Sequence, residues 1–205
     1  MAIVLDGTAN TVTPLNGALG GTTPSTVVAT TVVASSTIKG ATTIAVGNAT
    51  PSASGAGITF PATQSASTDA NTLDDYEEGT WTPTITFNGA SVGVTYSSYR
   101  GGTYSKIGNR VFVTGIVELS NKGSSTGPAR IGGLPFTNAS GNDRYLGANI
   151  GGYNFTFTGQ YWGEIQQNTT TILMNQTTEA GTMSNLTNTN FTNATILEFS
   201  AQYST

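Results

Sequence analysis

The sequence has no cysteine and no histidine among its 205 residues. Without cysteine the chain forms neither disulfides nor thiolate metal sites, and without histidine it lacks the commonest general base and the usual zinc ligand. Charged residues make up only 9% of the chain, against about 25% in an ordinary globular protein. Seven basic residues at a net charge of −4 cannot form a phosphate-neutralising patch, so we expect no nucleic-acid partner. No run of about 20 apolar residues is present, so we expect no membrane insertion.

The first third of the chain is rich in small and β-branched residues. Glycine accounts for 26 residues of the whole sequence, and residues 1–68 carry just two charges, Asp6 and Lys39. β-Branched residues favour extended chain, but no aromatic residue precedes Phe60, so a single copy cannot build a core here. Such a segment is either a plain linker or a structure ordered by winding with identical copies. Its low charge and frequent valine are unlike typical disordered chains, so we predict that residues 1–70 form an extended, intertwined stem.

From about residue 80 onward, short runs of alternating apolar and polar residues are separated by Gly, Asn and Ser turns. This pattern predicts an antiparallel β-sandwich over residues 84–205, and no segment has a convincing helical period, so we predict an all-β chain. Strict alternation places apolar side chains on one face of each expected strand. Ile85 and Phe87 share one face of their expected strand, and one face of the next long strand carries Val111, Val113, Val117 and Leu119. The side chains predicted to point inward are Tyr153, Phe155, Phe157, Leu197, Phe199, Ala201 and Tyr203.

The stretch "RVFVTGIVEL" is apolar on both faces of its expected strand, because Phe112 and Ile116 lie opposite the valines. A strand of this kind is covered twice, which suggests its own domain on one side and a neighbouring subunit on the other. Just before it, Gly108 and Asn109 are suited to a tight turn, so we predict a hairpin between residues 104–107 and 110–119.

The stretch "NTLDDYEEGTWTPTITF" places Asp74, Asp75, Glu77 and Glu78 beside one of only two tryptophans. A catalytic carboxylate pair needs two separated groups, one of them buried, and a calcium loop needs acidic residues at alternating positions around a glycine. "DDYEEG" has neither spacing. We therefore predict a structural junction over residues 71–83, with no catalytic residue, no cofactor and no metal.

In such a junction, mutual repulsion would drive the carboxylates outward or toward basic partners. The nearest basic residues in sequence are Arg100, Lys106 and Arg110. Tyr76 and Trp81 are then expected to pack inward, and Asp74, Asp75, Tyr76 and Trp81 become candidates for junction or oligomer contacts.

Two groups of residues are candidates for contact with a receptor. Tyr161 and Trp162 are adjacent, so in a strand they point to opposite faces and one of them can reach solvent, where aromatic rings stack on sugars and anchor protein contacts. The alternative is that both are buried. The loop "TNASGNDRYLG" offers Asn138, Asn142, Arg144 and Tyr145 for hydrogen bonds with glycans, and its alternative is an ordinary solvated loop.

Three stretches occur in order between Gly57 and Phe136: "GITFPATQSASTDANTLDDYEEGTWTP", "TYSKIGNRVFVTG" and "KGSSTGPARIGGLPF". Together they resemble a module at the carboxyl ends of phage tail-fibre and related virion structural proteins. The resemblance implies a homotrimeric fibre whose amino-terminal part faces the virion and whose β-sandwich head lies at the tip, where host contact is expected. Residues 137–205 match no motif of that family.

The sequence therefore predicts a virion protein, assembled in the host cytoplasm, that attaches to the host. Its expected partners are two further copies of itself, other virion structural proteins through the amino-terminal segment, and a glycan or protein of the host surface. The start, "MAIVLDGTAN", is not expected to be a secretory signal. One alternative is a head fibre or capsid-decorating protein. A polysaccharide depolymerase tailspike is less favoured, because the chain is short and its carboxylates cluster in one stretch.

Overall fold

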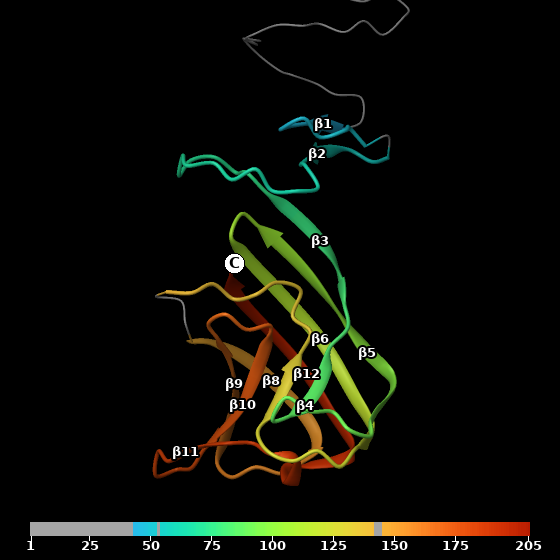
Figure 1. The fold of residues 1–205 in the computed structure, drawn as a ribbon, viewed down its shortest axis with the longest axis vertical. Helices are drawn as coiled ribbons and strands as arrows, with labels where there is room; N and C mark the ends of the chain where they lie inside the picture. The colour runs from blue at the N-terminus through green and yellow to red at the C-terminus, as the bar shows by residue number, and fades with distance from the viewer. Residues whose placement is uncertain (1–42, 53, 142–144) are drawn as a thin grey trace, which may run out of the picture. The chain divides into compact units, whose positions relative to one another are not determined.

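The computed structural model describes residues 43–52, 54–141 and 145–205. Two short strands, β1 (Thr43–Ala45) and β2 (Gly57–Thr59), form a two-stranded parallel sheet. Everything else of regular structure belongs to one ten-stranded sheet and a single 3-10 turn, η1 (Asn188–Asn190) (Figure 1). The sheet strands are β3 (Tyr76–Trp81), β4 (Thr84–Phe87), β5 (Val94–Ile107), β6 (Arg110–Lys122), β7 (Ala129–Gly132), β8 (Tyr145–Phe155), β9 (Gln160–Gln166), β10 (Thr171–Thr177), β11 (Met183–Asn185) and β12 (Phe191–Ser204).

The large sheet curls on itself. Its strands follow the order β3-β5-β6-β12-β8-β9-β10-β7-β4, with β11 added beside β10, and every pairing is antiparallel. The two ends of this order, β3 and β4, are separated in sequence only by Thr82 and Pro83, so the chain itself holds them close together. Register shifts in β5 near Tyr96 add to the bending. The all-β class is confirmed. We expected a sandwich of two separate sheets, but one curled sheet forms both of its layers.

The core lies inside the curl, where the inward faces of its two halves meet. Ile85, Ile131, Ile165 and Ile172 form one fully buried row across β4, β7, β9 and β10. The shared face of β12, with Leu197, Phe199 and Tyr203, is buried as predicted, and the face of β6 that is buried is the one with Val111, Val113, Val117 and Leu119. Removing such side chains from water supplies most of the favourable free energy of folding.

One predicted strand face is wrong. Tyr153 is 62% exposed and Phe157 is 43% exposed, whereas both were expected to point inward. The alternation fails because Asn154 has a left-handed φ of 58° and the register between β8 and β12 shifts between Phe191 and Ile196. Phe155 alone of the three packs against the core, beside Tyr161 and Phe191.

The predicted hairpin is confirmed. Ile107 pairs with Arg110, and Gly108, with a φ of 55°, occupies the first position of the turn, which favours glycine. The sheet begins at Tyr76 rather than at residue 84, because β3 pairs along its length with β5. By contrast, none of the described residues between 43 and 73 is buried. No helix in the described part of the chain is long and apolar enough to cross a membrane.

Candidate functional site

An ion pair with Lys106 of β5 attaches the acidic stretch to the sheet. The Lys106 ammonium donates to Asp75 Oδ2 and lies 3.7 Å from Glu77 Oε1. Asp75 is only 1% exposed and Lys106 only 4%, and the ammonium also lies 5.5 Å from the centre of the Phe136 ring. Burying these charges is tolerated because they neutralise each other, and losing one would leave the other uncompensated.

The remaining carboxylates of this stretch, and that of Asp69 just before it, accept short-range hydrogen bonds. The backbone N–H of Asn71 donates to Asp69 Oδ1 at 2.8 Å, and that of Ser67 donates to Asp74 Oδ2 at 2.7 Å. The Tyr76 hydroxyl donates to Glu78 Oε2 at 2.8 Å, and this bond, with the charge of Glu78, raises the pKa of the phenol. The carboxylates therefore serve turns and pairings, an arrangement that supports a structural role.

The strand β3 places its side chains on alternate faces, and this corrects one expectation. Trp81 points into the core, as predicted, but Tyr76 is 42% exposed and lies on the outer face. Because the Asp75–Lys106 pair is buried, residues 75, 77, 79 and 81 share the inner face, and Tyr76 must take the other one. The role of Asp74, Asp75, Tyr76 and Trp81 in contacts between copies stays a prediction.

Trp81 fastens the acidic stretch to the sheet. Its indole Nε1 donates to the Thr114 carbonyl at 3.1 Å, and its ring meets Phe199 edge-on at 5.7 Å between centroids. Gly102 makes this possible, because a Cβ there would lie 2.5 Å from the indole nitrogen. Of the other basic residues considered, Arg100 donates from Nε to the Pro83 carbonyl at 2.7 Å and stacks on Tyr96, while Arg110 is exposed at the start of β6.

The residues predicted to contact a receptor do not form one group. Asn138 is 1% exposed, so its assignment as a glycan contact is wrong: its backbone bonds with Thr169 and Asn168 hold it beneath the surface. Asn142 and Arg144 lie outside the described residues, and of Tyr145 only the backbone, in β8, is described.

Tyr161 and Trp162 point to opposite faces, as predicted. Tyr161 is partly buried against Phe155 and Phe157, at 5.0 and 4.4 Å between ring centroids. Trp162 is partly exposed on the outer face, and its Nε1 donates to Thr177 Oγ1 at 3.4 Å. Contact of Tyr161 or Trp162 with a receptor stays a prediction.

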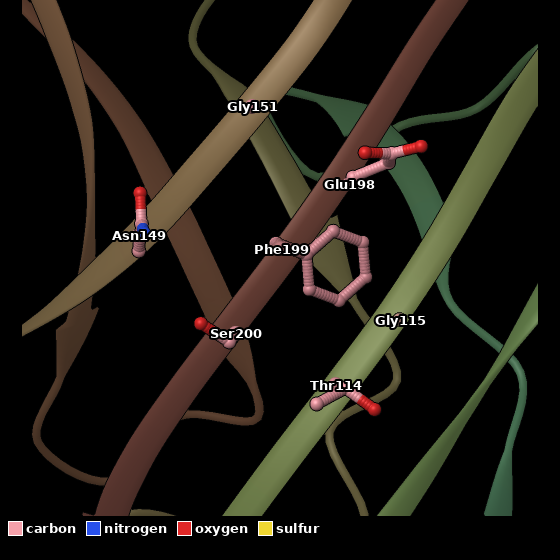
Figure 2. A pocket seen from close by; sticks show the side chains of 7 residues that line it. All are labelled: Thr114, Gly115, Asn149, Gly151, Glu198, Phe199 and Ser200. Carbon is pink, nitrogen blue, oxygen red and sulfur yellow. The ribbon is translucent and has the colours of Figure 1, made fainter.

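A groove on the outer face of the sheet was missed by the sequence analysis. It has a volume of about 390 Å³ and runs over three neighbouring strands, β6, β12 and β8 (Figure 2). Thr114 lies on one flank and Asn149 on the other, with Glu198 and Ser200 on β12 between them. The lining also includes Gly115, Gly151 and Phe199. The only signal in the sequence was the pair of glycines within "GGY", because glycine inside a strand often marks a place where something approaches closely.

Among the described residues, no three acidic side chains are grouped so as to hold a metal ion.

Comparison with known proteins supports the fold. No protein-family model matches the chain, and no curated protein matches it. Among solved structures, the crystal structure of the Dettilon tailspike protein (gp208) is similar, with a TM-score of 0.51 at 17% identity. The similarity covers 63% of this chain and only 24% of the tailspike chain. At that identity the similarity shows a shared β fold and nothing more specific, so the motif resemblance stays a prediction.

Proposed function

We propose that this chain is a structural fibre component of a phage virion, and specifically a tail fibre that attaches the particle to the host surface. The observation that carries the proposal is the fold: the curled sheet resembles part of a protein whose name describes it as a tailspike. The three sequence motifs between Gly57 and Phe136 lead independently to the same class of virion protein. Low charge and abundant Thr, Asn and Ser suit a protein that works outside a cell.

Association into a homotrimer is part of this proposal. The described residues between 43 and 73 bury nothing within one chain, and Ile44 and Ile58 are 41% and 57% exposed. Winding three copies together would cover such apolar surface and also protect the edge strands of the small sheet.

We propose a binding role rather than a catalytic one. Asp75 and Glu77 face Lys106, and Asp69, Asp74 and Glu78 accept hydrogen bonds from their own neighbourhood. A hydrolase of polysaccharide would instead place two carboxyl groups on either side of a bound sugar. Attachment through several identical heads needs only weak single sites, because avidity multiplies them.

Immuno-electron microscopy of the virion tests the proposal. Antibodies raised against residues 71–205 should label the tips of tail appendages, and the purified full-length protein should reduce adsorption of the phage to its host. Label over the capsid would instead identify a head fibre or decorating protein. Release of oligosaccharide from host polysaccharide by the purified protein would identify a depolymerase.

A further inference from the structure

The groove on the outer face of β6, β12 and β8 exists because a strand residue has no side chain. Gly152 faces the core, since a Cβ there would meet Phe155 and Leu197, so the neighbouring Gly151 faces outward. A Cβ on Gly151 would have no atom nearer than 3.8 Å, and its φ is not left-handed. Neither internal packing nor backbone conformation requires glycine at this position. Glycine at this position leaves the backbone of β8 open beside Glu198, so that a ligand can approach it closely.

The polar groups around that space are free to bind. The side chains of Asn149, Glu198 and Ser200 form no hydrogen bond or ion pair with any other described residue. They come from two neighbouring strands, and the register places Ser200 beside Asn149 and Glu198 beside Gly151. Figure 2 shows them around the groove together with Thr114, whose hydroxyl is bonded to that of Thr103 at 3.0 Å. An amide, a carboxylate and a hydroxyl thus provide both donors and acceptors within one groove.

This lining excludes several classes of ligand. No lysine or arginine is among the seven described residues that line the groove, and Glu198 repels anions, so a phosphate, a nucleic acid or an acidic sugar is disfavoured. The lining offers no aliphatic pocket for a peptide side chain, and β12 is paired on both sides, so a peptide cannot add to it as a further strand. A neutral, polyhydroxylated molecule meets none of these objections.

We propose that this groove is a binding site for a neutral glycan, with Asn149, Glu198 and Ser200 as its hydrogen-bonding residues. The carboxylate of Glu198 accepts from sugar hydroxyls, the Asn149 amide both donates and accepts, and Gly151 lets the sugar ring approach the sheet. The inference rests on the proposed attachment function and identifies the class of host molecule that it uses. A volume of about 390 Å³ falls at the small end of ligand sites, which are roughly 300–1,000 Å³, and suits one or two sugar residues.

The test compares two glycine variants on the same face of the sheet. Gly151→Val fills the groove with a side chain that strands favour. Gly101→Val is the matched control: Gly101 also faces outward, a Cβ there would meet nothing within 4 Å, and it lies across β6 from Glu198. Beads coated with full-length protein are applied to an array of purified bacterial surface polysaccharides, some neutral and some acidic. Wild type and Gly101→Val should bind neutral polysaccharides, and Gly151→Val should lose at least about tenfold of the signal with its melting temperature unchanged or raised.

A third variant keeps the proposal testable if Gly151→Val folds poorly. Glu198→Gln preserves size but removes the charge, so it should lower neutral binding about fivefold, because bonds to a charged acceptor are stronger. It should also reduce the discrimination against acidic polysaccharides. Three outcomes would overturn the proposal. Gly151→Val and Glu198→Gln could both bind as well as the wild type, the wild type could prefer acidic polysaccharides, or the wild type could bind no polysaccharide.

The same beads on host cells separate this proposal from the attachment function. If wild type and Gly151→Val bind cells equally well, the groove is not the site and attachment stands. If wild type binds neither cells nor polysaccharides, the attachment function itself fails.

Discussion

The segment between residues 43 and 73 and the curled sheet of residues 76–205 draw on the same low-charge, threonine-rich composition, yet only the sheet has a core. In the leading segment, Phe60 is the sole aromatic residue and no described residue is buried. In the sheet, large apolar side chains recur at every second position and 21 hydrophobic residues are buried. The comparison shows that the spacing of large apolar residues, rather than β-propensity, decides which part of a single chain can bury a hydrophobic core.

The largest effect is expected from removing the tryptophan that joins the acidic stretch to the sheet. Trp81→Ala deletes a side chain that is 7% exposed, its contact with Phe199 and its bond to Thr114. Large-to-small changes of this kind cost about 3–5 kcal/mol of unfolding free energy. Urea unfolding followed by circular dichroism measures this loss.

Tyr99→Ala is the control for Trp81→Ala, because Tyr99 is 66% exposed and its loss should cost less than about 0.5 kcal/mol. Equal stability of Trp81→Ala and wild type would show that the acidic stretch is not part of the folded sheet.

A smaller loss is expected from breaking the buried ion pair. Lys106→Met leaves the Asp75 carboxylate without its cation at 1% exposure, which should cost about 3 kcal/mol in the same unfolding assay. The double variant Lys106→Met with Asp75→Leu removes both charges and should recover most of that loss. If the single and double variants were equally destabilised, lost packing rather than an uncompensated charge would be the cause.

Much of the sheet could be predicted from local pattern. The alternation in residues 197–203 identified the buried face of β12, that in residues 111–119 showed which side chains of β6 share a face, and Gly108 identified the hairpin. These signals are local, because side-chain direction in a strand follows from the period of two. The same rule failed at Tyr153, where the positive φ of Asn154 interrupts the period.

What could not be predicted depends on contacts between distant parts of the chain. The curl requires β6 to pair with β12 and β4 to pair with β7, and nothing in a single strand specifies such partners. The side taken by Tyr76 was set by the burial of the neighbouring Asp75 with Lys106. The groove combines residues 114, 149 and 198, which only the finished sheet brings together.

Raising the pH should lower the unfolding free energy by as much as Lys106→Met does, or slightly less, because of Tyr203. This residue is fully buried near the end of β12. Burial raises the pKa of its phenol from 10.0 to about 12, although the backbone N–H of Phe136 donates to its oxygen and lowers it in part. The unfolded chain therefore releases this proton first as pH rises. Stability is complete below pH 10 and falls between pH 10 and about 12, by roughly 2–3 kcal/mol in total.

Unfolding free energies measured from pH 9 to 12 check this, and Tyr203→Phe isolates the effect from the exposed tyrosines. The variant should be less stable at neutral pH, by about 1 kcal/mol for the lost acceptor, and should have a flatter pH dependence. An identical slope in both proteins would assign the alkaline loss to other groups.

The smallest effect on the sheet is expected in the leading segment, and it sharpens the comparison most. Ile58 lies beside Ile44 in the β1–β2 pair, and it is 57% exposed in a single chain. Ile58→Ser should therefore change the unfolding free energy of the sheet by less than about 0.5 kcal/mol.

If three copies cover this surface, the same change should weaken association by about 1 kcal/mol for each copy. Sedimentation over a dilution series measures that weakening, with Val92→Ser, in the turn before β5 and 67% exposed, as the control. A wild type that stays a single chain at every concentration would reject the trimer. A trimer indifferent to Ile58→Ser would show that the apolar surface of this segment lies outside its interface.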